Sequence, residues 1–129
     1  MPSKQEHLEQ ARRNRAFADS VDRERFPEWV PVAWFYCALH LVDALLAEAL
    51  PDRMAHPTNH VRRVQALSTT RAWSEYPALA EHYSALDTLS RRGRYACRPD
   101  SVAFAPDRLE EVYREDFIPL VEQLEALLA

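Results

Sequence analysis

The sequence contains almost no glycine: Gly93 is the only one among 129 residues. Tight hairpin turns depend on glycine, and β-branched residues are also few, so the composition argues against a fold built from β-hairpins. Lysine is nearly absent as well, because Lys4 is the only one and every other basic residue is an arginine, whose planar fork suits phosphate and carboxylate groups. With 47% hydrophobic and 28% charged residues, the chain is expected to form one all-α globular domain over residues 1–129.

Cysteine and net positive charge are also scarce. Cys37 and Cys97 form neither a disulfide framework nor a C-x-x-C motif, and we expect no cofactor. The formal net charge of −4 argues against a generally cationic nucleic-acid binder. The charge is uneven, however, because residues 53–98 carry eight arginines and three acidic residues, whereas residues 99–129 carry two and eight. The middle third is therefore the candidate surface for an anionic ligand.

One long hydrophobic run, residues 32–50, is apolar around nearly the whole helical circumference, which is typical of a buried central helix. The run approaches transmembrane length, but His40 and Asp43 at its centre would be costly in a bilayer. The N-terminus is polar and resembles no signal peptide, so we expect a cytoplasmic protein without membrane contact. Tyr36, His40 and Asp43 share one face of the helix, and the two buried polar groups each need a partner.

Periodicity and helix-breaking residues predict a compact up-and-down bundle of four principal helices plus one short helix. A capping box at Ser3 and Glu6 begins a peripheral N-terminal helix within residues 1–25. The last helix is expected to begin at a similar box at Asp107, and Pro119 should kink or divide it. Residues 51–57 and 68–75 are predicted to be irregular. The remaining helices are expected over residues 32–50, 59–68 (short) and 77–93, and the last over 107–128.

Two details of this bundle depend on single positions. The short helix is expected to be capped by Thr58 or Asn59 and to direct Val61, Val64 and Leu67 inward. Gly93 near the end of the following helix is either a C′ cap or a place where two helices approach closely.

The run from Tyr36 to Leu46 resembles the Y-x-A-x-H-x-x-x-A-L-L helix of the HEPN (higher eukaryotes and prokaryotes nucleotide-binding) family. The later pieces have the same order: a loop with His56 and His60, a short helix, and a helix that ends in Ser-Arg-x-x-Arg-Tyr at residues 90–95. The resemblance covers about residues 30–128 and implies a HEPN-like bundle and a homodimer. Such proteins often accompany toxin–antitoxin or phage-defence systems, sometimes paired with a small nucleotidyltransferase.

By this resemblance, many members are metal-independent ribonucleases with an Arg-x4–6-His motif, in which arginine steadies the phosphate and histidine takes the 2′-hydroxyl proton. No histidine follows His82 in this chain, so the resemblance implies a catalytically degenerate nucleotide- or RNA-binding module. An alternative is a ribonuclease in which His40 or His60 replaces the missing histidine and works with Arg91 or Arg94. A further alternative is a non-catalytic dimerisation or interaction module.

The strongest functional signal is a cluster of arginines around a tyrosine at the end of the third principal helix. Arginine with an interleaved aromatic suits phosphate contact and base stacking, whereas a solvated helix end explains one or two such cations better than four. Residues 36 and 40 join these candidates if they face the same pocket. The candidate ligand- and phosphate-binding residues are Arg91, Arg92, Arg94, Tyr95, Arg98, Tyr36 and His40.

The polar residues of the central helix also have a purely structural interpretation. In it, Asp43 pairs with an arginine of residues 91–94, and His40 donates to a backbone carbonyl or a tyrosine. His56 and His60 form an H-x3-H pair, which we interpret as capping or loop packing. We predict no metal site, because this pair supplies only two ligands and no sequence motif supplies the others. His40, His82, Cys97 or a carboxylate would have to complete the ligand set.

Overall fold

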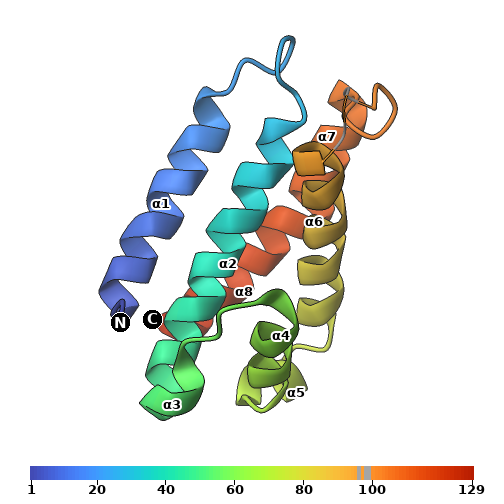
Figure 1. Ribbon diagram of the computed structural model, residues 1–129. Coiled ribbons are helices and arrows are strands. Elements are labelled where there is room, and N and C mark those ends of the chain that lie inside the picture. Colours follow the sequence, from blue (N-terminus) through green and yellow to red (C-terminus); the bar gives the residue numbers. More distant parts are fainter. Residues whose placement is uncertain (96, 98–99) are drawn as a thin grey trace.

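The computed structural model describes residues 1–95, 97 and 100–129, and in this part of the chain every regular element is helical. Long segments run alternately up and down (Figure 1), so the prediction of an all-α helical bundle is confirmed. These segments are α1 (Lys4–Ser20), α2 (Trp29–Ala49), α6 (Ala78–Tyr95) and a C-terminal segment of α7 (Pro106–Val112), a π-helical turn η1 (Tyr113–Phe117) and α8 (Ile118–Leu128).

Helix α2 lies at the centre of the bundle. It contacts α1, α6 and α8, and its buried side chains form most of the core. Among the described residues it is the one helix long and apolar enough to cross a membrane, with a hydropathy of 1.7. Because 83% of that apolar window is buried inside the protein, the helix has the character of a soluble protein's core helix.

Helix α1 lies along α2 although most of its side chains are polar (Figure 1). The predicted capping box is confirmed: Glu6 N–H donates to Ser3 Oγ at 3.1 Å, and Ser3 N–H donates to the Glu6 carboxylate at 2.7 Å. The contact with α2 is made through the small buried residues Ala11 and Ala18. Phe17 falls beside this stripe and is 54% exposed.

Three short helices follow α2: α3 (Asp52–Ala55) and α4 (His60–Ser68), which contact its C-terminal end, and α5 (Arg71–Glu75), which contacts α4 and α6. The prediction that residues 51–57 and 68–75 are irregular was therefore wrong, since each stretch contains a helix of one turn. Such a helix is too short to show an apolar periodicity in the sequence. The prediction of α4 is confirmed, with Asn59 as its cap: Arg62 N–H donates to Asn59 Oδ1 at 2.9 Å.

The buried face of α4 differs from the expected one. Leu67 is buried as predicted, but Val61 is 68% exposed and Val64 is exposed as well. In their place Arg63 is buried, because its guanidinium reaches the carboxylate of Asp43 on α2. Apolar periodicity cannot predict which face of a helix is buried when a buried ion pair determines its orientation.

Helix α6 presents an apolar face to the core and approaches α2 closely at its C-terminal end. The helix continues past Gly93, which has no positive φ, so the glycine is not a C′ cap. A Cβ atom at Gly93 would lie 2.5 Å from the carbonyl oxygen of Glu28 and 2.9 Å from Cγ2 of Val32. The close-contact alternative is thus confirmed, and it brings the arginines of α6 next to α2. The buried face of α6 consists of Leu79, Tyr83, Leu86, Leu89, Ser90 and Gly93.

The C-terminal segment is divided near Pro119, as predicted. Proline has no N–H and its ring clashes with the carbonyl four residues earlier, and the π-turn just before it absorbs the mismatch. In that turn Ile118 N–H donates to Tyr113 O, five residues back. The capping box expected at Asp107 is absent in the described structure, because α7 begins at Pro106 without a side-chain cap.

Candidate functional site

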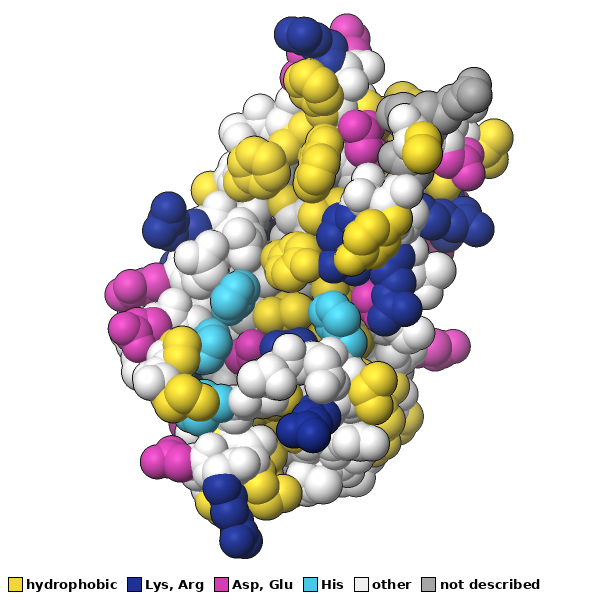
Figure 2. All heavy atoms as spheres, viewed as in Figure 1, with side chains coloured by type: hydrophobic (Ala, Val, Ile, Leu, Met, Phe, Trp, Pro, Cys, Tyr) yellow, Lys and Arg dark blue, Asp and Glu magenta, His cyan; other side chains and the backbone are white. Residues whose placement is uncertain are grey.

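The outer face of α2 carries three polar residues in a row, and each contacts a different element. Figure 2 shows histidine, arginine and aromatic side chains gathered in the middle of this face of the molecule. The three pairs are Tyr36 with Arg94 of α6, His40 with His7 of α1, and Asp43 with Arg63 of α4.

The pair of Asp43 and Arg63 is the most buried of the three. Arg63 Nε donates to Asp43 Oδ1 at 2.7 Å and its Nη2 donates to Oδ2 at 3.3 Å, with side chains 9% and 10% exposed. Nη2 also donates to the carbonyl oxygen of Pro57 at 3.2 Å. The expectation that Asp43 pairs with an arginine of residues 91–94 was wrong, because α4 covers this part of α2. The pair ties α4 and the segment before it to the central helix.

His40 contacts a second histidine, not the backbone carbonyl or tyrosine expected for it. The Nδ1 atoms of His40 and His7 lie 3.1 Å apart, and the ring centroids 5.4 Å apart. Burial lowers the pKa of both imidazoles, and in His40 the neighbouring His7 lowers the pKa further. His7 was not among the predicted site residues; its spacing of four residues from the buried Ala11 is the only and weak sequence signal of its inward position.

The end of α6 does reach the polar face of α2, at Tyr36. Arg94 Nη1 donates to the Tyr36 hydroxyl at 2.6 Å. The guanidinium carbon also lies 5.9, 5.5 and 5.2 Å from the ring centroids of Phe35, Tyr36 and Tyr95. Nη2 lies 3.9 Å from the Asp87 carboxylate. Arg94 is therefore held among aromatic rings and contacts both tyrosines, with a hydrogen bond to Tyr36.

Beyond Arg94, the surface opens into a hollow of about 570 Å³ lined by Arg91, Arg92, Tyr95 and Asp100. Tyr95 is 76% exposed. Arg91 Nε donates to Asp87 at 3.2 Å yet remains more than half exposed, and Arg92 is exposed too. Two cations and one tyrosine ring thus face solvent together. Arg98, the remaining arginine of the predicted set, lies outside the residues that the structure describes.

On the other side of Arg94, Tyr36 and His40 line a groove of about 360 Å³ between α1 and α2. Trp29 and Phe17, both exposed aromatic residues, also line it. Because Arg94 contacts Tyr36 as well as Tyr95, it lies between the groove and the arginine hollow. The predicted residues Tyr36, Arg94 and Tyr95 are therefore brought together, whereas His40 lies one turn further along α2.

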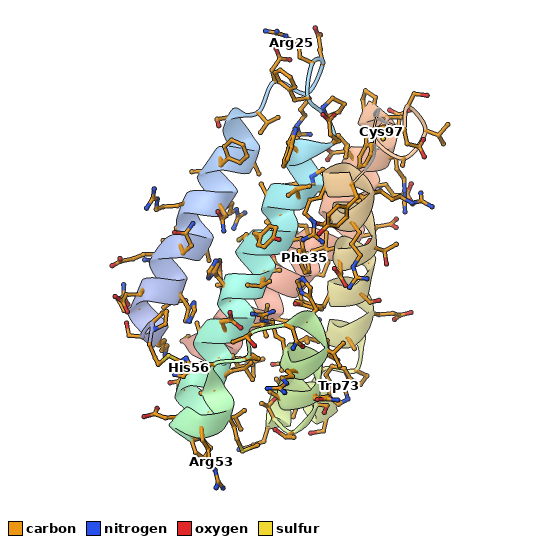
Figure 3. All side chains as sticks on the ribbon, viewed as in Figure 1. Arg25, Phe35, Arg53, His56, Trp73 and Cys97 are labelled. Carbon is orange, nitrogen blue, oxygen red and sulfur yellow. The ribbon has the colours of Figure 1, made fainter. Side chains whose placement is uncertain are left out.

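His56 and His60 are placed differently from each other. His56 follows α3, whereas Cys97 lies beyond the far end of α6 (Figure 3), so these two cannot share a metal ion. His60 lies in the first turn of α4, as expected, with its ring 5.5 Å from that of Phe35. Its Nδ1 is buried without a hydrogen-bond partner among the described residues, and this burial lowers its pKa.

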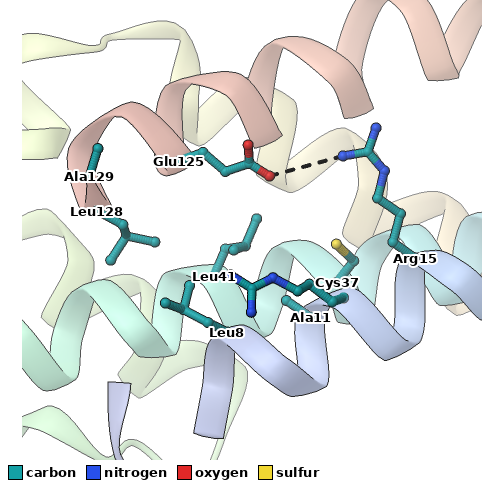
Figure 4. Close-up of a pocket in the computed structure, with 9 residues that line it drawn as sticks. Leu8, Ala11, Arg15, Cys37, Leu41, Glu125, Leu128 and Ala129 are labelled. Carbon is teal, nitrogen blue, oxygen red and sulfur yellow. Dashed lines mark ion pairs between the residues drawn. The ribbon is translucent and has the colours of Figure 1, made fainter. Parts of the chain in front are cut away.

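A separate apolar cavity of about 360 Å³ lies between α1, α2 and α8 (Figure 4). It is lined mainly by Leu8, Cys37, Leu41 and Leu128, and Arg15 lies 4.0 Å from Glu125 beside it. Burial raises the pKa of the Cys37 thiol to about 12, so the thiolate needed for reactivity is not formed near neutral pH. Cys37 is a core residue, in agreement with its position in the apolar run.

No family model, no curated protein and no solved structure matches this chain. The resemblance to HEPN proteins therefore stays a prediction that depends on the sequence pattern of α2, of the loop and short helix after it, and of α6.

Proposed function

We propose that this chain is a HEPN-like, catalytically degenerate module that binds single-stranded RNA or nucleotides on the surface formed by Arg91, Arg92, Arg94, Tyr95 and Tyr36. The observation that carries the proposal is the open hollow in which two exposed arginines flank an exposed tyrosine. Guanidinium groups bind phosphate oxygens in a bidentate manner, and a tyrosine ring offers a stacking surface to any base.

The contacts in the structure indicate different roles for these residues in the proposed binding. Arg91 and Arg92 are exposed and can meet phosphates from solvent, Arg91 by exchanging its contact with Asp87. Arg94 is held by the hydroxyl of Tyr36 and lies against the ring of Tyr95. The exposed Trp29 in the neighbouring groove offers a second stacking surface beyond Tyr36. A strand that follows this line would place one base on Tyr95 and the next part of the chain toward α1.

Fluorescence anisotropy with a short labelled single-stranded RNA tests the proposal. Tyr95→Ala should weaken binding about 5- to 150-fold, because stacking on one aromatic ring contributes about 1–3 kcal/mol. The double variant Arg91→Ala with Arg92→Ala should also bind weakly. The matched control, Arg12→Ala with Arg13→Ala, removes the same charge from exposed positions on α1 and should bind like the unmodified chain. Equal affinity of all variants would rule out this surface.

A second candidate is the ribonuclease in which His60 serves with Arg94. The observation in its favour is that both residues pack against Phe35, at 5.5 Å and 5.9 Å from its ring centroid. A neutral imidazole is the form that accepts a proton, and the lowered pKa of His60 maintains that form at neutral pH. Cleavage of RNA in the presence of a chelator, lost in His60→Gln, would support this activity; intact RNA after long incubation would exclude it.

The biological setting is part of the same proposal and follows from the resemblance. We infer a cytoplasmic homodimer that belongs to a toxin–antitoxin or phage-defence system and has a small nucleotidyltransferase as a partner. Light scattering on the purified chain would measure the oligomeric state directly. The third alternative is an interaction module. It predicts that the chain neither binds nor cleaves RNA and that its stability rises with the partner's concentration.

A further inference from the structure

We propose that His7, His40 and Asp43 bind one divalent transition-metal ion, with Zn²⁺ as the best match, between α1 and α2. One ligand atom from each residue lies within 4.8 Å of the other two. Two imidazoles and one carboxylate are a ligand set that proteins use for Zn²⁺ and Fe²⁺, with the remaining positions open to water. The inference is independent of the RNA-binding proposal.

The imidazoles are close to the separation that a shared ion requires. Their Nδ1 atoms lie 3.1 Å apart. In a tetrahedral site with Zn–N bonds of about 2.0–2.1 Å, two ligand nitrogens lie about 3.4 Å apart. His40 and Asp43 are three residues apart on α2 and share one face, so only His7 comes from another helix. Small side-chain movements complete the three-ligand site.

Asp43 is held in place by Arg63, which orients the carboxylate toward this face of α2. Carboxylates that ligate metals are commonly hydrogen-bonded in turn, and each carboxylate oxygen retains a lone pair after accepting from Arg63. The positive charge of Arg63 opposes that of the ion, so the affinity should be micromolar and not that of a closed four-ligand site. His40 is only half-buried and lines the groove next to α1, so water can reach the open positions.

A zinc titration of the metal-free full-length chain, monitored with a competing chromophoric chelator, tests the site. We expect one ion per chain and a rise in Tm on binding. His7→Ala should weaken binding by at least about 100-fold, because the loss of a ligand costs more than the 10- to 100-fold measured for outer partners. The controls His82→Ala and Cys97→Ser remove other metal-binding side chains and should leave the affinity unchanged.

A second measurement needs no variant. Ring-nitrogen NMR signals of His7 and His40 should shift on adding Zn²⁺, while those of His60 and His82 should not. Binding that survives both His7→Ala and His40→Ala, or is lost in Cys97→Ser, would overturn the proposal. So would a wild-type chain whose Tm and histidine signals do not change up to millimolar Zn²⁺, because the contact between His7 and His40 would then be a hydrogen bond alone.

Discussion

At the scale of single residues, the buried ion pair of Asp43 and Arg63 has the largest effect on how α4 packs against α2. Burying either charge alone costs free energy, and the guanidinium and the carboxylate offset this cost through two hydrogen bonds. The carbonyl oxygen of Pro57 accepts a further hydrogen bond from Arg63. The pair therefore specifies the position of α4 on α2 more than it adds stability. It also leaves Val61 and Val64 outside, where apolar packing alone would not place them.

Arg63→Ala should lower the free energy of unfolding by about 3–5 kcal/mol, because it leaves the Asp43 carboxylate buried without its partner. Urea denaturation followed by circular dichroism measures the change. Arg71→Ala is the control, since its ion pair with Glu75 is exposed and should contribute no more than about 1 kcal/mol. Similar losses in the two variants would show that the buried pair is not special.

His60 should make the fold sensitive to acid. Burial holds its pKa below the ordinary value of 6.5, so below about pH 6.5 the unfolded chain binds the proton more readily than the folded one. Stability is therefore lost as the pH falls from about 6.5 toward the lowered pKa. His60→Gln should lose less stability than the unmodified chain between about pH 7 and about pH 5 in urea denaturation. An unchanged pH dependence would contradict this assignment.

The sequence identified the polar residues of α2 but not their partners. That Asp43 requires a cation follows from its place in an apolar helix, and the same holds for a partner to His40. Which arginine pairs with Asp43 depends on how α4 packs against α2, and neither the apolar periodicity nor the residue spacing predicts that packing. His7 was missed for a related reason: it lies on a helix whose buried stripe consists of alanines, so its inward position is not marked by neighbouring large apolar residues.

Among the helices, the junction of α6 and α2 matters most for the candidate site. Gly93 lets the two backbones approach so closely that a methyl group would meet the carbonyl of Glu28, which cannot move without disturbing the start of α2. This approach places Arg94 over Tyr36. The long helices were predictable because their periodicity extends over several turns, whereas α3 and α5 have too few residues to show one.

Gly93→Ala should lower the free energy of unfolding by about 1–3 kcal/mol, since the added methyl group overpacks the junction. It should also weaken RNA binding, because it displaces the segment with Arg94 and Tyr95. Thermal denaturation and anisotropy measure the two effects. Ser84→Ala on the exposed side of α6 is the matched control and should be neutral or slightly stabilising. A stabilising Gly93→Ala would mean that the helices separate without cost.

In the whole molecule, the arginine hollow is a local exception on an acidic protein. The formal net charge is −4, so repulsion from the rest of the surface limits the affinity for a polyanion. The proposed RNA binding would therefore depend on a few close contacts, which short single strands can make more easily than a stiff duplex can. The C-terminal segment carries most of the excess negative charge.

Salt should weaken RNA binding only moderately. About three phosphate contacts give a slope near −2 in a plot of log affinity against log salt concentration, or about a 100-fold loss for a tenfold increase in salt. Anisotropy titrations at several salt concentrations measure this slope, and Arg91→Ala with Arg92→Ala should reduce it. A much steeper slope that the double variant leaves unchanged would place the binding surface elsewhere.

The neighbourhood of the two chain ends has a practical consequence. Lys4 Nζ donates to the carbonyl oxygen of Leu128 at 3.0 Å, and both ends lie at the corner of the bundle away from the last turn of α6 (Figure 1). An affinity handle, a fluorophore or a fused protein attached at either end would therefore emerge from the same corner. Immobilised through that corner, the molecule would present Arg91, Arg92 and Tyr95 unobstructed to anything in solution.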